Sequence, residues 1–77
     1  MPMAFVFITT EPASMLKVFK ALKKIKGVKE VEMVYGLYDI VAKVEEDSIS
    51  SLKNIITKRI RAINKVATTT TIMAVKA

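Results

Sequence analysis

Two short stretches of this sequence carry side chains that suit the binding of a small polar ligand. The first is "GLYD", residues 36–39, where a carboxylate enters the apolar run "YDIVAKV". The second is the threonine run at residues 68–71. Glycine frees backbone N–H groups for a ligand, a carboxylate pairs with an ammonium group, and threonine hydroxyls bind a carboxylate. Together these groups could hold a free amino acid.

The same residues also have a purely structural explanation, which the sequence leaves open. In it, Gly36 only forms a turn, Tyr38 packs against neighbours, and Asp39 accepts a hydrogen bond from a nearby backbone N–H. The threonines would then reflect β-propensity alone.

Catalysis and metal binding are disfavoured by composition. The chain has no His and no Cys, which removes the imidazole base, the thiolate nucleophile and the usual zinc ligands. We therefore expect no enzyme activity, no metal and no cofactor. A small ferredoxin-like oxygenase stays an alternative with Asp39 as its only candidate catalytic group.

Length and composition predict one small cytoplasmic domain over residues 1–77. With 52% hydrophobic residues the chain is too apolar to be disordered, yet its apolar runs are too short to span a bilayer. The N-terminus lacks the features of a signal peptide. The abundance of Lys, Ile and Val suits a heat-adapted organism.

Hydrophobic periodicity predicts the elements that must position these groups. A β-branched and aromatic segment predicts a strand at 3–10, and apolar residues at helical spacing predict a helix at 12–26 that ends before Gly27. Residues 28–46 read as a hairpin turning near Gly36. A second helix follows, capped by Asp47 or Ser48, with an apolar stripe. The stripe consists of Ile49, Leu52, Ile56, Ile60 and Ile63. Residues 66–77 form the closing strand.

The order β-α-β-β-α-β predicts an α+β, ferredoxin-like fold: a four-stranded antiparallel sheet with two helices on one face. The first strand is apolar at both parities, with Phe5 and Phe7 on one side and Val6 and Ile8 on the other. Because large exposed apolar patches are rare on soluble monomers, we expect a homodimer packed sheet to sheet.

The net charge of +6 raises the alternative of a small basic nucleic-acid-binding protein. RNA-recognition motifs share this element order, but here Leu37 and Asp39 stand where their stacking strand has aromatic residues. The lysines lie mostly on the predicted helices, as expected of a solvated face.

Two segments make the chain resemble the effector-binding (RAM) domain of the Lrp/AsnC feast/famine transcriptional regulators. They are "VKEVEMVYGLYDIVAKV", with its Gly-x-Tyr-Asp, and "NKVATTTTIMAVK", with its Val-x-x-Thr-x-Thr strand. The resemblance covers nearly the whole chain and implies amino-acid binding between dimers that assemble into octamers or similar rings. It implies ligand-binding roles for Gly36, Leu37, Tyr38, Asp39, Thr69, Thr70 and Thr71.

Regulators of that family carry an N-terminal helix-turn-helix, whereas this chain begins at the first strand. The resemblance therefore implies a stand-alone domain without sequence-specific DNA binding or membrane association, which could co-assemble with full-length relatives. An ACT-like regulatory domain is the nearest alternative; ACT domains associate side by side, whereas the first strand here favours face-to-face sheets.

Overall fold

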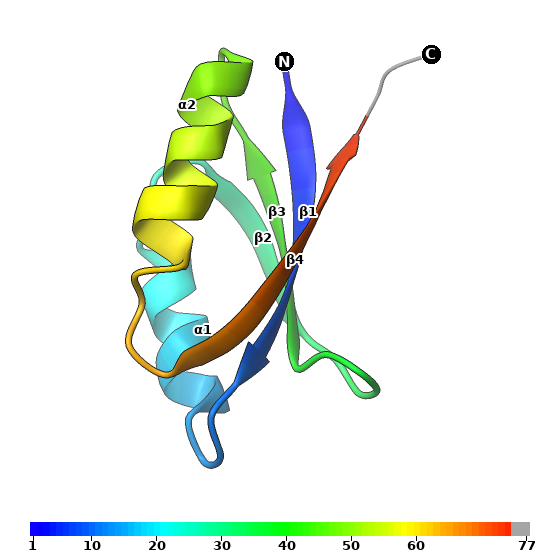
Figure 1. Cartoon of the computed structure of the whole chain (residues 1–77), viewed down its shortest axis with the longest axis vertical. Helices are drawn as coiled ribbons and strands as arrows, with labels where there is room; N and C mark the ends of the chain where they lie inside the picture. Colours follow the sequence, from blue (N-terminus) through cyan, green and yellow to red (C-terminus); the bar gives the residue numbers. More distant parts are fainter. Residues whose placement is uncertain (75–77) are drawn as a thin grey trace.

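The protein, described from a computed structural model over residues 1–74, is a four-stranded antiparallel sheet with its helices on one face (Figure 1). The strands are β1 (Met3–Thr10), β2 (Val28–Met33), β3 (Ile40–Glu45) and β4 (Val66–Ala74). The helices are α1 (Met15–Lys23) and α2 (Ile49–Asn54), which continues into the π-helical segment η1 (Ile55–Ile60). The strand order β2-β3-β1-β4 puts β1 in the interior of the sheet. The predicted ferredoxin-like fold is confirmed.

The boundaries of α1 differ from the prediction. Ala13 has φ 63°, a left-handed conformation that cannot continue a helix, so the helix begins after Ser14 and not at Pro12. At the other end the N–H groups of Lys24 and Ile25 bond carbonyls three residues back, which tightens the last turn before Gly27. Gly27 has φ 99°, as expected for a residue just past a helix.

The second helix begins as expected, with Ser48 accepting a hydrogen bond from the N–H of Ser51 at 3.1 Å. Its stripe was only partly right. Ile49 is 55% exposed, whereas Ile55, which the predicted stripe omitted, is buried beside Ile56. Ile55 lies three residues after the buried Leu52, a spacing that places both on one helix face.

The core lies between the helices and one face of the sheet. Ala4, Val6 and Ile8 of β1 are fully buried there, and Phe5 and Phe7, on the alternate parity, face the other way and are half-buried. Residues of α1, α2 and η1 cover the core on the side opposite the sheet, and Gly27 lies close against η1. A Cβ on Gly27 would lie 2.6 Å from Cδ1 of Ile55.

The last strand is β-structured as predicted, up to Ala74, and the rest of the predicted strand, residues 75–77, lies outside the described residues. β4 pairs with β1 from Ala74 opposite Met3 to Val66 opposite Thr10. A register shift between Thr9 and Thr10 marks a bulge at that end.

Candidate functional site

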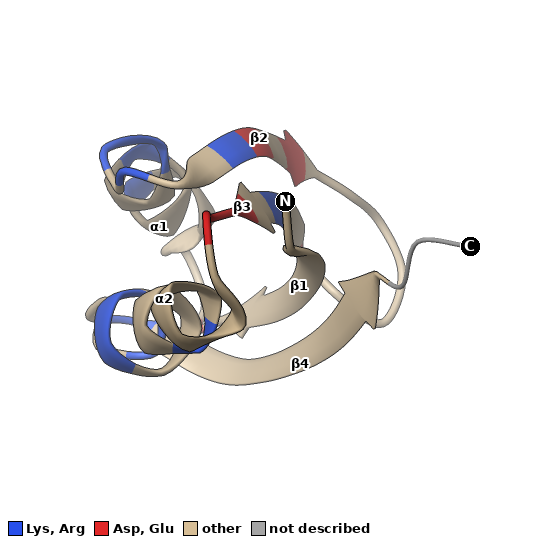
Figure 2. Ribbon diagram, turned by 90° about the horizontal axis from the view of Figure 1, so that it is seen from above, with Lys and Arg blue, Asp and Glu red and all other residues tan. Residues whose placement is uncertain are grey.

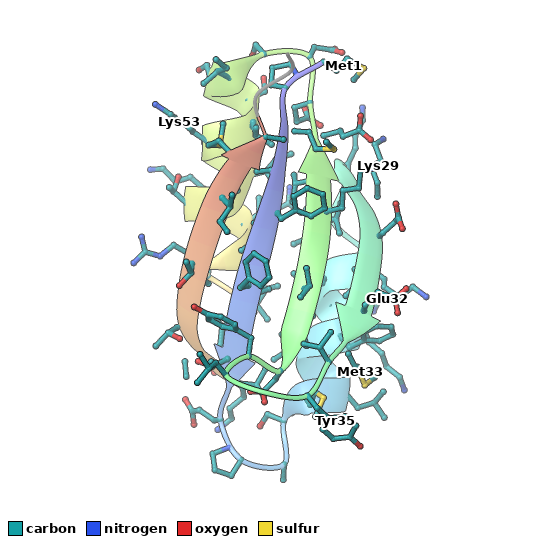
Figure 3. All side chains as sticks on the ribbon, turned by 90° about the vertical axis from the view of Figure 1, so that its right-hand side faces the viewer. Met1, Lys29, Glu32, Met33, Tyr35 and Lys53 are labelled. Carbon is teal, nitrogen blue, oxygen red and sulfur yellow. The ribbon has the colours of Figure 1, made fainter. Side chains whose placement is uncertain are left out.

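The open face of the sheet, which no helix covers, carries two of the predicted site residues, Tyr38 and Thr70, and Figure 3 looks onto it. Phe5 and Phe7 project from β1, Val41 from β3, and Ile72, 54% exposed, from β4. Beside them, Glu30 of β2 and Lys43 of β3 form an ion pair, with Nζ of Lys43 3.5 Å from Oε2 of Glu30. The face is therefore apolar around Phe5 and Phe7, carries threonines along β4, and is charged where β2 meets Lys43.

The β2–β3 loop, residues 34–39, projects at one end of this face. Tyr35 is fully exposed and Leu37 is 89% exposed. Gly36 has φ 133°, a conformation that side chains disfavour, with open space where a Cβ would stand. Within residues 1–74, the backbone N–H groups of residues 35–38 make no hydrogen bond. The loop tip thus presents free donors to whatever approaches it.

Asp39 fastens the end of this loop to β1. Its N–H donates to the carbonyl of Ile8 at 2.9 Å, and its carbonyl accepts from the N–H of Val34 at 2.9 Å. Its side-chain Oδ2 accepts from the N–H of Thr10 at 2.8 Å and from the Thr10 hydroxyl at 3.3 Å. The carboxylate bonds a backbone N–H, which was the structural alternative that the sequence left open. The second oxygen, Oδ1, has no hydrogen bond to any described residue.

Tyr38 lies over the open face. Its ring centroid is 5.3 Å from that of Phe7, with the two planes tilted by 49°. Its hydroxyl donates to Oγ1 of Thr70 at 3.4 Å. The loop and the last strand, more than thirty residues apart in sequence, therefore meet on this face through Tyr38 and Thr70.

The threonine run divides between the two faces of the sheet because side chains alternate along a strand. Thr70 pairs with Phe7 and Thr68 with Thr9, so both stand on the open face. The hydroxyls of Thr68 and Thr9 are hydrogen-bonded to each other. Thr69 and Thr71 are paired with the core residues of β1 and point to the helix side.

Thr71 instead borders a pocket between β4 and the second helix. This pocket has a volume of about 330 Å³. Lys53, Ile56, Thr57, Thr71 and Met73 line it. The structure therefore brings Tyr38 and Asp39 together with Thr70, whereas Thr69 and Thr71 lie on the opposite face of the sheet.

Sequence reasoning missed Phe7 and Thr10 as members of this site. Phe7 supports the Tyr38 ring and Thr10 binds the Asp39 carboxylate. Thr10 is 29 residues away from Asp39, so no local spacing marks the pair. The register of β1 on β3 creates the contact, and an alternating strand pattern does not specify that register.

Residues 1–74 contain no group of three or more potential His, Cys, Asp or Glu ligands for a metal ion. No helix among them is long and apolar enough to cross a membrane.

This ferredoxin-like fold belongs, by the family comparison, to a class of ligand-binding domains. Residues 3–77 match the family model described as the Lrp/AsnC ligand binding domain, and the chain belongs to that family. The resemblance noted in the sequence is confirmed, and the family is a different one from the ACT-like domains. A comparison with curated proteins found no match.

Solved structures agree with the family. The chain is 35% identical to FFRP-DM1, with TM-score 0.93, covering 97% of this chain and 100% of that one. It is 34% identical to a hypothetical protein from Pyrococcus horikoshii, with TM-score 0.92, covering 100% of this chain and 93% of that one. It shares the fold of a transcriptional regulator from Neisseria meningitidis solved in complex with L-methionine, at 13% identity and TM-score 0.85. That match covers 97% of this chain and 50% of the regulator.

Proposed function

We propose that this domain binds a free amino acid beside the β2–β3 loop and acts as a subunit that responds to that ligand. The observation that carries the proposal is the loop itself: it presents free backbone N–H groups next to the Tyr38–Thr70 contact, and Asp39 fixes it to β1. The family is named for ligand binding, and the fold-related Neisseria regulator was solved with L-methionine.

The chemistry of an amino acid suits these groups. Its carboxylate would accept hydrogen bonds from the free N–H groups near Gly36 and Leu37, as anions do at backbone donors. Its ammonium would pair with Oδ1 of Asp39, the oxygen that Thr10 leaves free. Tyr38 would border the side chain.

Threonines contribute unequally to this proposal. Thr70 is the member of the run that faces the loop. Thr69 and Thr71 would touch a ligand only at the β4 edge, where Thr71 borders the pocket beside Lys53. Thr70 beside the loop, and Thr69 and Thr71 at the β4 edge, form one site only if a ligand reaches from the loop of one copy to the β4 edge of another copy.

The open face supports the second half of the proposal, a sheet-to-sheet homodimer. Large apolar side chains gain about 1.5–3 kcal/mol each when fully buried, and a two-fold axis counts each twice. Phe5, Phe7, Val41 and Ile72 all lie on this face, only partly buried in the single chain. Their combined burial is comparable with the roughly 4–15 kcal/mol cost of association. We further propose that dimers assemble into octamers or similar rings and co-assemble with full-length Lrp/AsnC regulators.

Ligand binding is tested by adding each common amino acid and measuring both the melting temperature and the sedimentation coefficient. A ligand that binds the folded assembly raises the melting temperature by mass action. Tyr38→Ala should abolish the response of any hit, whereas Tyr35→Ala, a matched change at a fully exposed tyrosine of the same loop, should retain it. If no amino acid shifts melting or size, the sensing proposal fails.

The dimer is tested separately by sedimentation at micromolar concentration. Phe5→Lys places a charge on the open face and should give a species of 8.6 kDa. Leu16→Lys makes the same change at a 55% exposed residue of α1 on the opposite side of the molecule and should leave the dimer intact. A wild-type chain that sediments only as a monomer would contradict the interface.

A further inference from the structure

Positive and negative charges are segregated between the two sides of this molecule. Residues 12–26 and 48–65, which form the helices and their flanks, contain no acidic residue. All the acidic residues lie in the strands, the β2–β3 loop and the connections at the ends of β1 and β3. Figure 2 shows the resulting separation, with blue concentrated on α1 and α2 and red on β2 and the end of β3.

Nine cations on the helix side form what we call the basic layer. Its members are Lys17, Lys20, Lys23, Lys24, Lys26, Lys53, Lys58, Arg59 and Arg61. Every one of them is exposed. Among the described residues the ion pairs are Lys43 with Glu30 and Lys65 with Glu11, so no cation of the basic layer is paired with a carboxylate there.

A surface of like charges without counter-charges carries a self-repulsion that surface salt bridges would relieve. The layer is also unsuited to contact with a second copy of itself, since facing layers would repel. It lies on the side of the sheet away from the open face, so dimerisation through that face would leave both layers outward (Figure 1). The complementary partner is therefore a polyanion.

The side chains around the layer indicate which polyanion. A membrane-surface helix needs a broad apolar face, but the apolar face of α1, with Val18 and Leu22, is buried in the core. Single-stranded nucleic acid is bound by aromatic side chains that stack on bases. Here Phe5, Phe7 and Tyr38 are on the opposite side of the sheet. The aromatic residue of α1, Phe19, is half-buried against the core, and Nζ of Lys23 lies 5.2 Å from its ring centroid. What remains is a field of flexible ammonium and guanidinium groups, which suits the regular phosphates of a duplex.

We propose that the basic layer binds duplex DNA through its phosphates, independently of sequence. The helices lie flat against the sheet and bury one face in it, so they cannot enter the major groove as recognition helices do. Contact with the phosphate backbone alone positions a protein without reading bases. Co-assembly with DNA-binding relatives would add this layer to their DNA contact.

The signature of such binding is its salt dependence. If about four phosphates are neutralised per copy, the slope of log K against log salt concentration is about −3.6. Affinity then falls by about 150-fold between about 50 and 200 mM salt. Two duplexes of unrelated sequence should bind with equal affinity at each salt concentration.

The experiment uses fluorescence anisotropy with the full chain and a labelled duplex of about 30 base pairs, which at about 3.4 Å per base pair exceeds the 37 Å long axis of the domain. Lys17→Glu is the first variant, because an acidic residue in the first turn of α1 suits the helix dipole and leaves folding intact. Lys53→Glu tests the second helix. Lys29→Glu on β2 is the matched control, an exposed lysine outside the layer with the same change in net charge.

Each layer variant should weaken binding about 3- to 10-fold at low salt and make the salt slope shallower by about 1–2, and Lys29→Glu should change affinity less than 2-fold. Equal losses for Lys17→Glu and Lys29→Glu would overturn the proposal, since net charge alone would then be responsible. No binding at about 50 mM salt, or tighter binding to vesicles of anionic lipid than to the duplex, would also overturn it.

Discussion

The contact between Asp39 and Thr10 makes a prediction whose size follows from its geometry. Asp39→Ala removes the acceptor of the Thr10 N–H at 2.8 Å and of its hydroxyl at 3.3 Å. A hydrogen bond to a charged group contributes about 1.5–3 kcal/mol, and a buried donor left unpaired costs about 1–3 kcal/mol. Both residues are only half-buried, so water compensates part of the loss. We expect the free energy of unfolding to fall by about 1–2 kcal/mol.

For a domain of this size that loss lowers the melting temperature by about 4–16 °C. Two milder variants grade the effect: Asp39→Asn keeps an acceptor for the Thr10 N–H, and Thr10→Val removes only the longer hydroxyl bond. Both should lose less than about 1 kcal/mol. Urea unfolding followed by circular dichroism measures all three, at one fixed protein concentration because any subunit association adds to apparent stability.

The control for this series is Glu32→Ala, which removes a carboxylate from an exposed position of β2. Exposed substitutions of that kind change stability by about 0.5 kcal/mol or less. If Asp39→Ala is no more destabilising than Glu32→Ala, the carboxylate does not fasten the loop. If Asp39→Asn is as harmful as Asp39→Ala, the negative charge matters and the acceptor geometry does not.

Two further contrasts test the packing. Both glycines have a positive φ, so alanine at either should cost about 1 kcal/mol of strain. At Gly27 the added Cβ must also displace the side-chain ends of Glu46 and of Ile55, so Gly27→Ala should destabilise by about 1 kcal/mol more than Gly36→Ala, which has open space around it; thermal unfolding separates them. Leu52→Ala empties a fully buried site and should cost about 2–5 kcal/mol, and the similar truncation Ile49→Ala, at a 55% exposed residue, should cost under about 1 kcal/mol in urea unfolding. Equal losses within either pair would contradict the packing described.

The fold was largely predictable because its signals are local and agree with each other. Alternation along β1 predicted that its two apolar sets lie on opposite faces of the sheet, although it left open which set faces the helices, and Gly27 marked the end of the first helix. The start of that helix was wrong by three residues because proline at a first turn is a common signal, and nothing in the sequence shows that Ala13 adopts a left-handed conformation.

The candidate site was less predictable because its contacts are long-range. The sequence pointed to Asp39 as a polar group in an apolar strand, but it could not show that Thr10 occupies one of its oxygens. Strand alternation alone predicts that Thr70 lies on the opposite face of the sheet from Thr69 and Thr71. The face on which each set lies depends on the register of β4 against β1, which the bulge near Thr10 modifies.

The pairing of β1 with β4 has a consequence for how the chain folds. These are the first and last strands, and their most distant hydrogen-bonded side chains are 59 residues apart in a chain of 77. Closing so long a loop costs entropy before the contacts compensate for it, which slows folding. Until β4 is synthesised, one edge of the apolar β1 has no partner in its own chain. The nascent chain is therefore most exposed to misassembly at the strand that, once folded, lies in the interior of the sheet.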